Sequence, residues 1–163
     1  MPRVVLFQPQ IPPNTGNVAR TCAATGTELH LVEPLGFEIN DRQLRRAGLD
    51  YWPWVPLHRH QDWTSFLAHR ARSGGRLIAL SRHGTDSYLA TPYQPDDWLV
   101  FGRETDGLPA EAIDACDQVL TIPMRCSSDR AEGGVRSLNL SVSVGVVLFE
   151  ALRQLGDPEP ASL

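Results

Sequence analysis

The stretch from Leu99 to Pro109, LVFGRETDGLP, constrains the fold more than any other part of this chain. Three apolar residues run directly into Gly102, and a charged segment then leads to Gly107. This pattern predicts a buried strand that ends in bare backbone and ionisable groups, at the sheet edge where open α/β folds bind ligands. The glycine spacing resembles a phosphate-binding P-loop, but a P-loop requires Lys and Ser or Thr after its second glycine. Leu108 and Pro109 stand there instead, so a P-loop is excluded.

Short apolar strands alternate with amphipathic segments along the whole chain. The predicted strands are Val4–Phe7, Glu28–Val32, a short one at Val55 and Leu57, Leu77–Leu80, Leu99–Phe101 and Val119–Ile122. The predicted helices are one capped by Asn14 or Thr15 that ends near Gly26, then Asp41–Gly48, Asp62–Arg72, Pro109–Ala115 and Ser137–Gln154. This alternation predicts an α/β fold with a mainly parallel sheet and helices on both faces.

The composition is that of one soluble globular domain. With 163 residues, 42% hydrophobic and 21% charged, we expect a single domain over residues 1–155 and a frayed tail over 156–163. The longest apolar run, Val142–Phe149, is far too short to span a bilayer, and the N-terminus does not have the pattern of a signal peptide. Three cysteines without CxxC spacing are typical of reduced thiols in a cytoplasmic protein.

The net charge of −4 conceals an uneven distribution of charge. Residues 42–82 contain eight arginines and two acidic residues, whereas residues 83–163 contain five arginines and thirteen acidic residues. A basic segment of this kind is expected where a protein contacts a phosphate backbone. Solvated helix faces are an equally simple interpretation for any single arginine.

Three segments resemble, in order, the three motifs of the SPOUT methyltransferases. They are Asn14–Cys22 (NTGNVARTC), Leu99–Pro109, and Ile122–Met124 (IPM) with Ser137–Leu152. PPNTGN and RRAGLDY narrow the resemblance to the small enzymes that 2′-O-methylate the ribose of the tRNA wobble nucleotide, a cytidine or a modified uridine. The resemblance implies a C-terminal trefoil knot, a homodimer with the active site across its two-fold interface, and S-adenosylmethionine as methyl donor.

The sequence has no GxGxxG cradle for a nucleotide, so a donor would bind at strand ends and loops. By resemblance, Glu104 would lie near the positive sulfur of the donor. The full set of expected donor-binding residues is Leu80, Gly102, Glu104, Ile122, Met124, Ser137 and Leu138. Plain core packing is the alternative for Leu80 and Ile122, and an ordinary turn glycine is the alternative for Gly102.

The resemblance also assigns two catalytic residues. Arg20 would hold the substrate phosphate and 2′-hydroxyl and stabilise developing oxyanion charge, because an arginine does not deprotonate in proteins. Asn139 would hydrogen-bond the hydroxyl or order the knot loop. An exposed helix arginine is the alternative for Arg20. Contacts to the tRNA anticodon stem-loop are expected from the basic segment, at Arg42, Arg45 and Arg46.

Two departures from the family pattern and two alternatives complete the prediction. The segment 125–136 is longer than the resemblance leads us to expect, and Arg103 stands where many relatives have Pro, which predicts a less rigid turn.

His58 and His60 form a His-x-His pair, but no third ligand is spaced to complete a metal site, so no metal is expected. A catalytically inactive, knotted RNA-binding module is the alternative function; a nucleotide-binding α/β domain would lack its phosphate loop.

Overall fold

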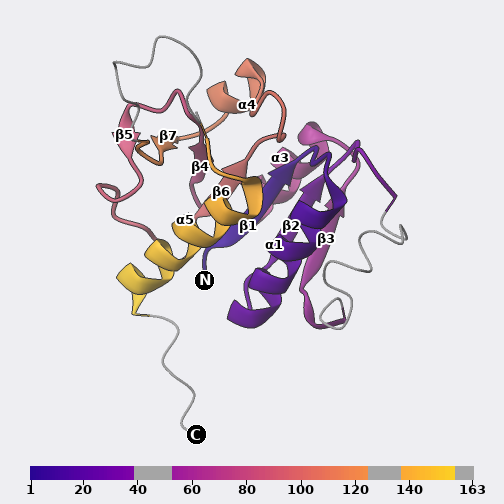
Figure 1. The fold of residues 1–163 in the computed structure, drawn as a ribbon, viewed down its shortest axis with the longest axis horizontal. Helices are drawn as coiled ribbons and strands as arrows, with labels where there is room; N and C mark the ends of the chain where they lie inside the picture. Colours follow the sequence, from indigo (N-terminus) through magenta and orange to yellow (C-terminus); the bar gives the residue numbers. More distant parts are fainter. Residues whose placement is uncertain (39–52, 125–136, 157–163) are drawn as a thin grey trace, which may run out of the picture.

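A computed structural model of the chain describes residues 1–38, 53–124 and 137–156. In these residues seven strands form one sheet, in which every neighbouring pair is parallel, in the order β3-β2-β1-β6-β4-β7-β5 (Figure 1). The strands are β1 (Arg3–Phe7), β2 (Leu29–Val32), β3 (Leu57–His60), β4 (Leu77–Leu80), β5 (Asp86–Ser87), β6 (Trp98–Phe101) and β7 (Gln118–Thr121). The helices are α1 (Pro12–Thr25), α3 (Trp63–Ser73), α4 (Ala110–Asp114) and α5 (Leu140–Leu155). The predicted α/β class is confirmed.

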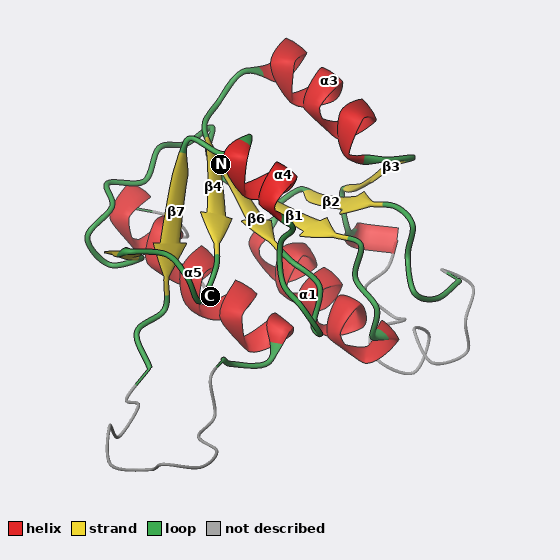
Figure 2. Ribbon diagram, turned by 90° about the horizontal axis from the view of Figure 1, so that it is seen from above, coloured by secondary structure: helices red, strands yellow, loops and turns green. Residues whose placement is uncertain are grey.

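The sheet is buried on both faces, as the apolar strands predict. On β1, Val4 and Leu6 pack in one core with α1 and α5, while Val5 and Phe7 pack in a second core with α3 and α4. Figure 2 shows α1 and α5 on one side of the sheet and α3 and α4 on the other. Alternate residues of a strand point to opposite faces, so each central strand contributes to both cores.

The strand order brings distant parts of the chain together. The chain builds β1, β2 and β3 toward one edge and then continues on the other side, where β6 inserts between β1 and β4. Leu80, Phe101 and Thr121 end β4, β6 and β7, and these three strands are neighbours in the sheet. Their following loops therefore meet at one carboxyl edge, the place where open parallel sheets bind ligands.

Two predicted helix starts are wrong. Helix α1 begins at Pro12, with Ile11 as its N-cap, because prolines fit the first helical positions, where no N–H is required. The Asn14 side chain is thereby released for a tertiary role. Helix α5 begins at Leu140 rather than at Ser137, and the Asn139 side chain caps it by accepting the Ser141 N–H at 2.9 Å.

Other predicted boundaries agree within a few residues. Asp62 caps α3 through the Ser65 N–H, and Gly26 ends α1 in the left-handed conformation. The two-residue strand β5 was not predicted, because Asp86 and Ser87 carry no apolar pattern and become a strand only by pairing with β7.

Several predictions fall on residues that the structure does not describe. The helix expected at 41–48, the arginines at 42, 45 and 46, the segment 125–136 and most of the tail lie outside the described residues. The trefoil knot depends on the path of the chain through 125–136, so it stays a prediction. No helix of the described part is long and apolar enough to cross a membrane.

Candidate functional site

A cavity of about 440 Å³ lies at the carboxyl ends of β4, β6 and β7, beside the start of α5. Five segments that are far apart in sequence form its wall, and both apolar and polar residues line it. All seven residues predicted to bind the donor line this cavity: Leu80, Gly102, Glu104, Ile122, Met124, Ser137 and Leu138. Asn139 lines it too, so one of the two predicted catalytic residues lies with them.

A polar network ties three walls of the cavity together. Asn14 Nδ2 donates to Glu104 Oε1 at 3.2 Å, and Asn139 Nδ2 donates to Asn14 Oδ1 at 2.9 Å. Asn139 Oδ1 in turn accepts the Ser141 N–H and hydroxyl. The loop after β6, the first turn of α1 and the start of α5 are therefore held in register by two amides and a carboxylate.

Glu104 has a second structural task beyond this network. Its carboxylate accepts the backbone N–H groups of Gln10 at 2.8 Å and Ile11 at 3.1 Å, at the N-terminal end of α1. Helix N-termini carry unpaired N–H groups and partial positive charge, and an acidic side chain satisfies both. Both carboxylate oxygens thus have protein partners. These hydrogen bonds give Glu104 a structural role that does not depend on the donor sulfur expected beside it.

The two glycines of the β6 turn have different roles. Gly107 adopts a positive φ of 75°. Gly102 is required by packing, since an added Cβ would overlap the Gly107 carbonyl carbon and the Leu108 nitrogen. The close approach at Gly102 is therefore made by the protein's own backbone.

The turn between these glycines is braced in place of the proline expected from the resemblance. Arg103 exchanges two backbone hydrogen bonds with Gly107, at 3.0 and 3.1 Å. Its guanidinium forms a bidentate ion pair with Asp106, at 2.7 Å for each bond, and donates to Gln8 Oε1 at 2.9 Å. The arginine thus makes contacts within the turn and with Gln8 that the sequence did not predict.

Arg20 does not line this cavity in the described chain. It lies on the exposed side of α1, six residues after Asn14, which corresponds to roughly 9 Å along a helix axis. It borders a separate hollow together with Ala23, Ala24 and Trp54. Trp54 is itself 75% exposed. A single copy of the chain therefore does not bring together the two predicted catalytic residues, Arg20 and Asn139.

Sequence reasoning missed several polar residues of the cavity wall. Ser81, Arg82 and His83 follow β4 directly, and Arg82 Nε donates to His83 Nε2 at 3.0 Å. Their position after a predicted buried strand was a usable signal, equal to the one that identified Gly102. Asn14 was considered only as a helix cap; no sequence pattern indicates its pairing with Asn139, 125 residues away.

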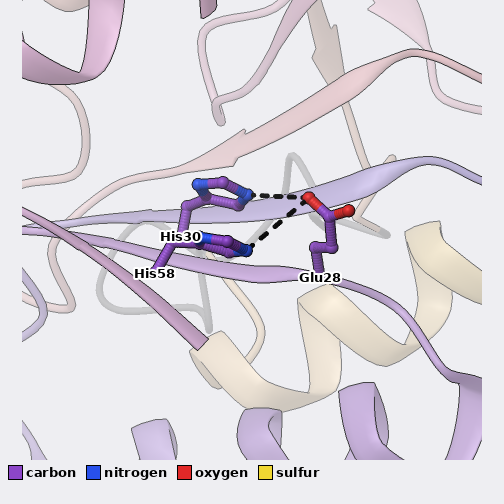
Figure 3. A group of neighbouring side chains, drawn as sticks. All are labelled: Glu28, His30 and His58. Carbon is purple, nitrogen blue, oxygen red and sulfur yellow. Dashed lines mark hydrogen bonds and ion pairs between the residues drawn. The ribbon is translucent and has the colours of Figure 1, made fainter. Parts of the chain in front are cut away.

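The expectation that His58 and His60 lack a third partner is wrong. Parallel pairing of β2 with β3 places His30 beside His58, and Glu28 lies next to both (Figure 3). His30 is fully buried, and burial lowers its pKa to about 3, with smaller contributions from neighbouring groups. It stays neutral at physiological pH. These residues lie at the far side of the sheet from the cavity, among β2, β3 and α3.

The described cysteines do not contribute a reactive nucleophile. Cys22 is packed between α1 and the sheet, and Cys116 lies beside α4. Burial raises the pKa of each thiol to about 12. Neither of these two thiols is in a disulfide in the described structure.

Comparisons with known proteins agree with the cavity and the motifs. The model of the SpoU rRNA Methylase family matches residues 1–149. The tRNA (cytidine(34)-2′-O)-methyltransferase of Escherichia coli K12 is 49% identical over 160 residues, which are 97% of this chain and 96% of that protein. A structure described as "Structural insights into the 2-OH methylation of C/U34 on tRNA" superimposes with a TM-score of 0.87 at 47% identity, covering 97% of this chain and 98% of that one.

A second solved structure carries a bound donor. The AdoMet-bound rRNA methyltransferase of Sinorhizobium meliloti superimposes with a TM-score of 0.81 at 28% identity, and the match covers 94% of this chain and 56% of that one. The family model covers most of the chain, and the Escherichia coli relative is similar over nearly all of it. The resemblance found in the motifs is thus confirmed, and the chain belongs to the SpoU rRNA methylase family.

Proposed function

We propose that this protein transfers a methyl group from S-adenosylmethionine to the 2′-hydroxyl of the ribose at nucleotide 34, the wobble position, of tRNA. The observation that carries the proposal is the gathering of seven expected donor-binding residues, from four separate segments, around one cavity. Relatives that share about half of their residues with this chain carry the name of that activity.

The cavity fits a nucleoside-type donor. Its volume of about 440 Å³ is within the range of small-molecule sites, roughly 300–1,000 Å³. Leu80, Ile122 and Leu138 supply an apolar slot suited to a base, and the strand ends supply backbone donors and acceptors. When bound, the donor supplies a methyl group on a positively charged sulfur. The protein's part is then to hold and orient the two reactants.

We assign Asn139 a positioning role. Its amide nitrogen and oxygen are both engaged, with Asn14 and Ser141, so it fixes the start of α5 against the cavity. Arg20 is the residue we assign to the substrate phosphate and ribose. As a permanent cation it stabilises negative charge that develops on the 2′-oxygen, and it leaves proton removal to water or another group.

We further propose that the active enzyme is a homodimer. Arg20 and the cavity are separated within one chain, which supports an arrangement in which a second copy brings its arginine to each cavity. Helix α5 provides a surface for the second copy, since Val142 is 49% exposed and Phe149 is 52% exposed although both are large and apolar.

The arginines at 42, 45 and 46 are proposed to bind phosphates of the anticodon stem-loop. Because the substrate is tRNA, we also propose that the protein acts in the cytoplasm.

Methylation of unmodified tRNA transcripts tests the proposal. Purified protein, S-adenosylmethionine and transcript are incubated, and the nucleosides of digested fragments are identified by mass spectrometry. We expect one 2′-O-methyl group per tRNA, located at nucleotide 34, and none on a transcript with a 2′-deoxyribose there. Donor binding without methylation of any tRNA would overturn the proposal in favour of an inactive RNA-binding module.

A further inference from the structure

Four of the chain's five histidines gather at the edge of the sheet opposite to the cavity. His30 on β2 is the register partner of His58 on β3, and Glu28 lies two residues before His30, so their side chains share one face. His60 on β3 shares that face. His69 reaches the face from α3, and its ring centroid lies 5.1 Å from that of His60. The chemistry that this cluster offers is imidazole nitrogen and carboxylate oxygen.

The distances between potential ligand atoms suit a bound cation. Glu28 Oε2 lies 3.3 Å from His30 Nε2 and 3.9 Å from His58 Nε2, and all three ligand atoms lie within 4.8 Å of one another. Ligands about 2.1 Å from a tetrahedral zinc ion lie roughly 3.4 Å apart. In Figure 3 both imidazole rings point toward the same carboxylate oxygen. Small side-chain movements, chiefly of the half-exposed His58, would open a place for the ion between them.

A supporting hydrogen bond already orients the buried ligand. His30 Nδ1 lies 2.9 Å from His60 Nε2, so His30 can donate from Nδ1 and keep the lone pair of Nε2 for a metal. Metal-bound histidines typically donate their other ring nitrogen to such a partner, which fixes the tautomer. Without a metal the reverse tautomers let His60 donate to His30, and His30 to Glu28. His30 and His60 can therefore exchange tautomers without a change in the orientation of either ring.

The neighbouring arginine does not prevent cation binding. Arg3 Nε donates to Glu28 Oε2 at 3.3 Å, but its guanidinium also stacks on the Trp98 ring at 4.5 Å. Arg3 and both histidines contact the same oxygen, Oε2, so the arginine, which keeps its support on Trp98, would turn to Oε1 when the metal takes Oε2. His69 on α3 is a further histidine of this cluster, with its ring centroid 5.5 Å from that of His30 and 6.0 Å from that of His58.

We propose that Glu28, His30 and His58 bind a zinc ion, with His60 as the partner that orients His30 and with His69 as a candidate for the fourth ligand. Imidazole and carboxylate ligands select zinc and similar transition metals over magnesium and calcium, which prefer oxygen ligands alone. The site lies at the start of β2, whereas the cavity lies at the ends of β4, β6 and β7. Its role is structural: the ion joins the edge strand β3 to β2.

Zinc titration of the full-length protein tests this proposal. Protein stripped with EDTA and dialysed competes for zinc with a chromophoric chelator, and we expect one zinc per chain. The variants His58→Ala and Glu28→Gln change half-exposed side chains, so they are expected to fold, which circular dichroism checks. We expect His60→Ala to weaken zinc affinity by about 10–100-fold, as for other supporting partners, and the two ligand variants to weaken it more.

Two controls make the result decisive. His83→Ala removes the one histidine that lies outside the cluster, and it should leave zinc affinity unchanged. The spectrum of the cobalt-substituted protein reports the ligand atoms, since thiolate ligands add strong near-ultraviolet charge-transfer bands that nitrogen and oxygen ligands lack. Three results would overturn the proposal. They are an absence of stoichiometric zinc, a zinc affinity in the two ligand variants that equals that of the wild type, and a cobalt spectrum with thiolate bands.

Discussion

Replacing Glu104 by Gln separates two roles for this carboxylate, as a structural brace and as a counter-charge for the donor sulfur. Gln keeps the size of Glu but offers one acceptor oxygen and turns an NH₂ group toward N–H donors. The N–H groups of Gln10 and Ile11 then both lose a charged partner, and at least one loses its acceptor, which is worth about 1.5–3 kcal/mol. Loss of negative charge at the start of α1 adds about 0.3–1 kcal/mol.

We therefore expect Glu104→Gln to lower the free energy of unfolding by about 2–4 kcal/mol. In a protein of this size, that corresponds to a Tm lower by about 4–16 °C. Thermal unfolding followed by circular dichroism measures the change. Asp106→Asn is the matched control: Asp106 is an exposed acid of the same turn that pairs with Arg103, and its replacement should leave Tm near that of the wild type.

Donor affinity distinguishes the two roles. S-adenosylmethionine carries the positive sulfur and S-adenosylhomocysteine does not, so a brace affects both ligands by the same factor. A counter-charge within about 4 Å of the sulfur would be worth roughly 1–4 kcal/mol for S-adenosylmethionine alone, at least a five-fold loss of preference. We expect calorimetry to give equal losses for both ligands. A selective loss for S-adenosylmethionine with unchanged Tm would refute the reasoning.

The remaining predictions concern the turn, the arginine, the interface and metal removal. Gly102→Ala should lower stability by about 1–3 kcal/mol, because the methyl group meets the Gly107 backbone; an unchanged denaturation midpoint would contradict this packing. Arg20→Ala should slow single-turnover methylation about 10²–10³-fold with donor affinity unchanged, and rescue by excess tRNA would reduce Arg20 to a binding residue. Phe149→Asp should yield monomers of about 18 kDa in sedimentation; a persistent dimer would move the interface elsewhere. Excess EDTA should leave calorimetric binding of S-adenosylhomocysteine intact, since the donor cavity and the histidine cluster lie at opposite ends of strands; loss of binding would join the two sites.

The sequence alone determined the fold class, and with the resemblance it identified eight of the residues that line the cavity. Apolar runs such as Leu77–Leu80 identify strands directly, because a parallel strand buried on both faces must be apolar throughout. The strand pattern placed Gly102 at the carboxyl edge of a predicted parallel sheet, where ligands bind. Resemblance in short motifs supplied the other expected donor-binding residues, among them Leu80, Ile122, Ser137 and Leu138, for which no periodicity gives a signal.

Only the tertiary structure decided what the polar residues do. Asn14 has the character of a helix cap in sequence, yet it pairs with Asn139, because the prolines before it start α1 earlier and leave its side chain to reach across the fold. The tertiary structure also brings Glu28, His30 and His58 together, because the register of β2 with β3 fixes which side chains become neighbours. Burial and periodicity are local properties that a sequence records, whereas a hydrogen bond or a ligand set depends on distances that arise when separate segments pack.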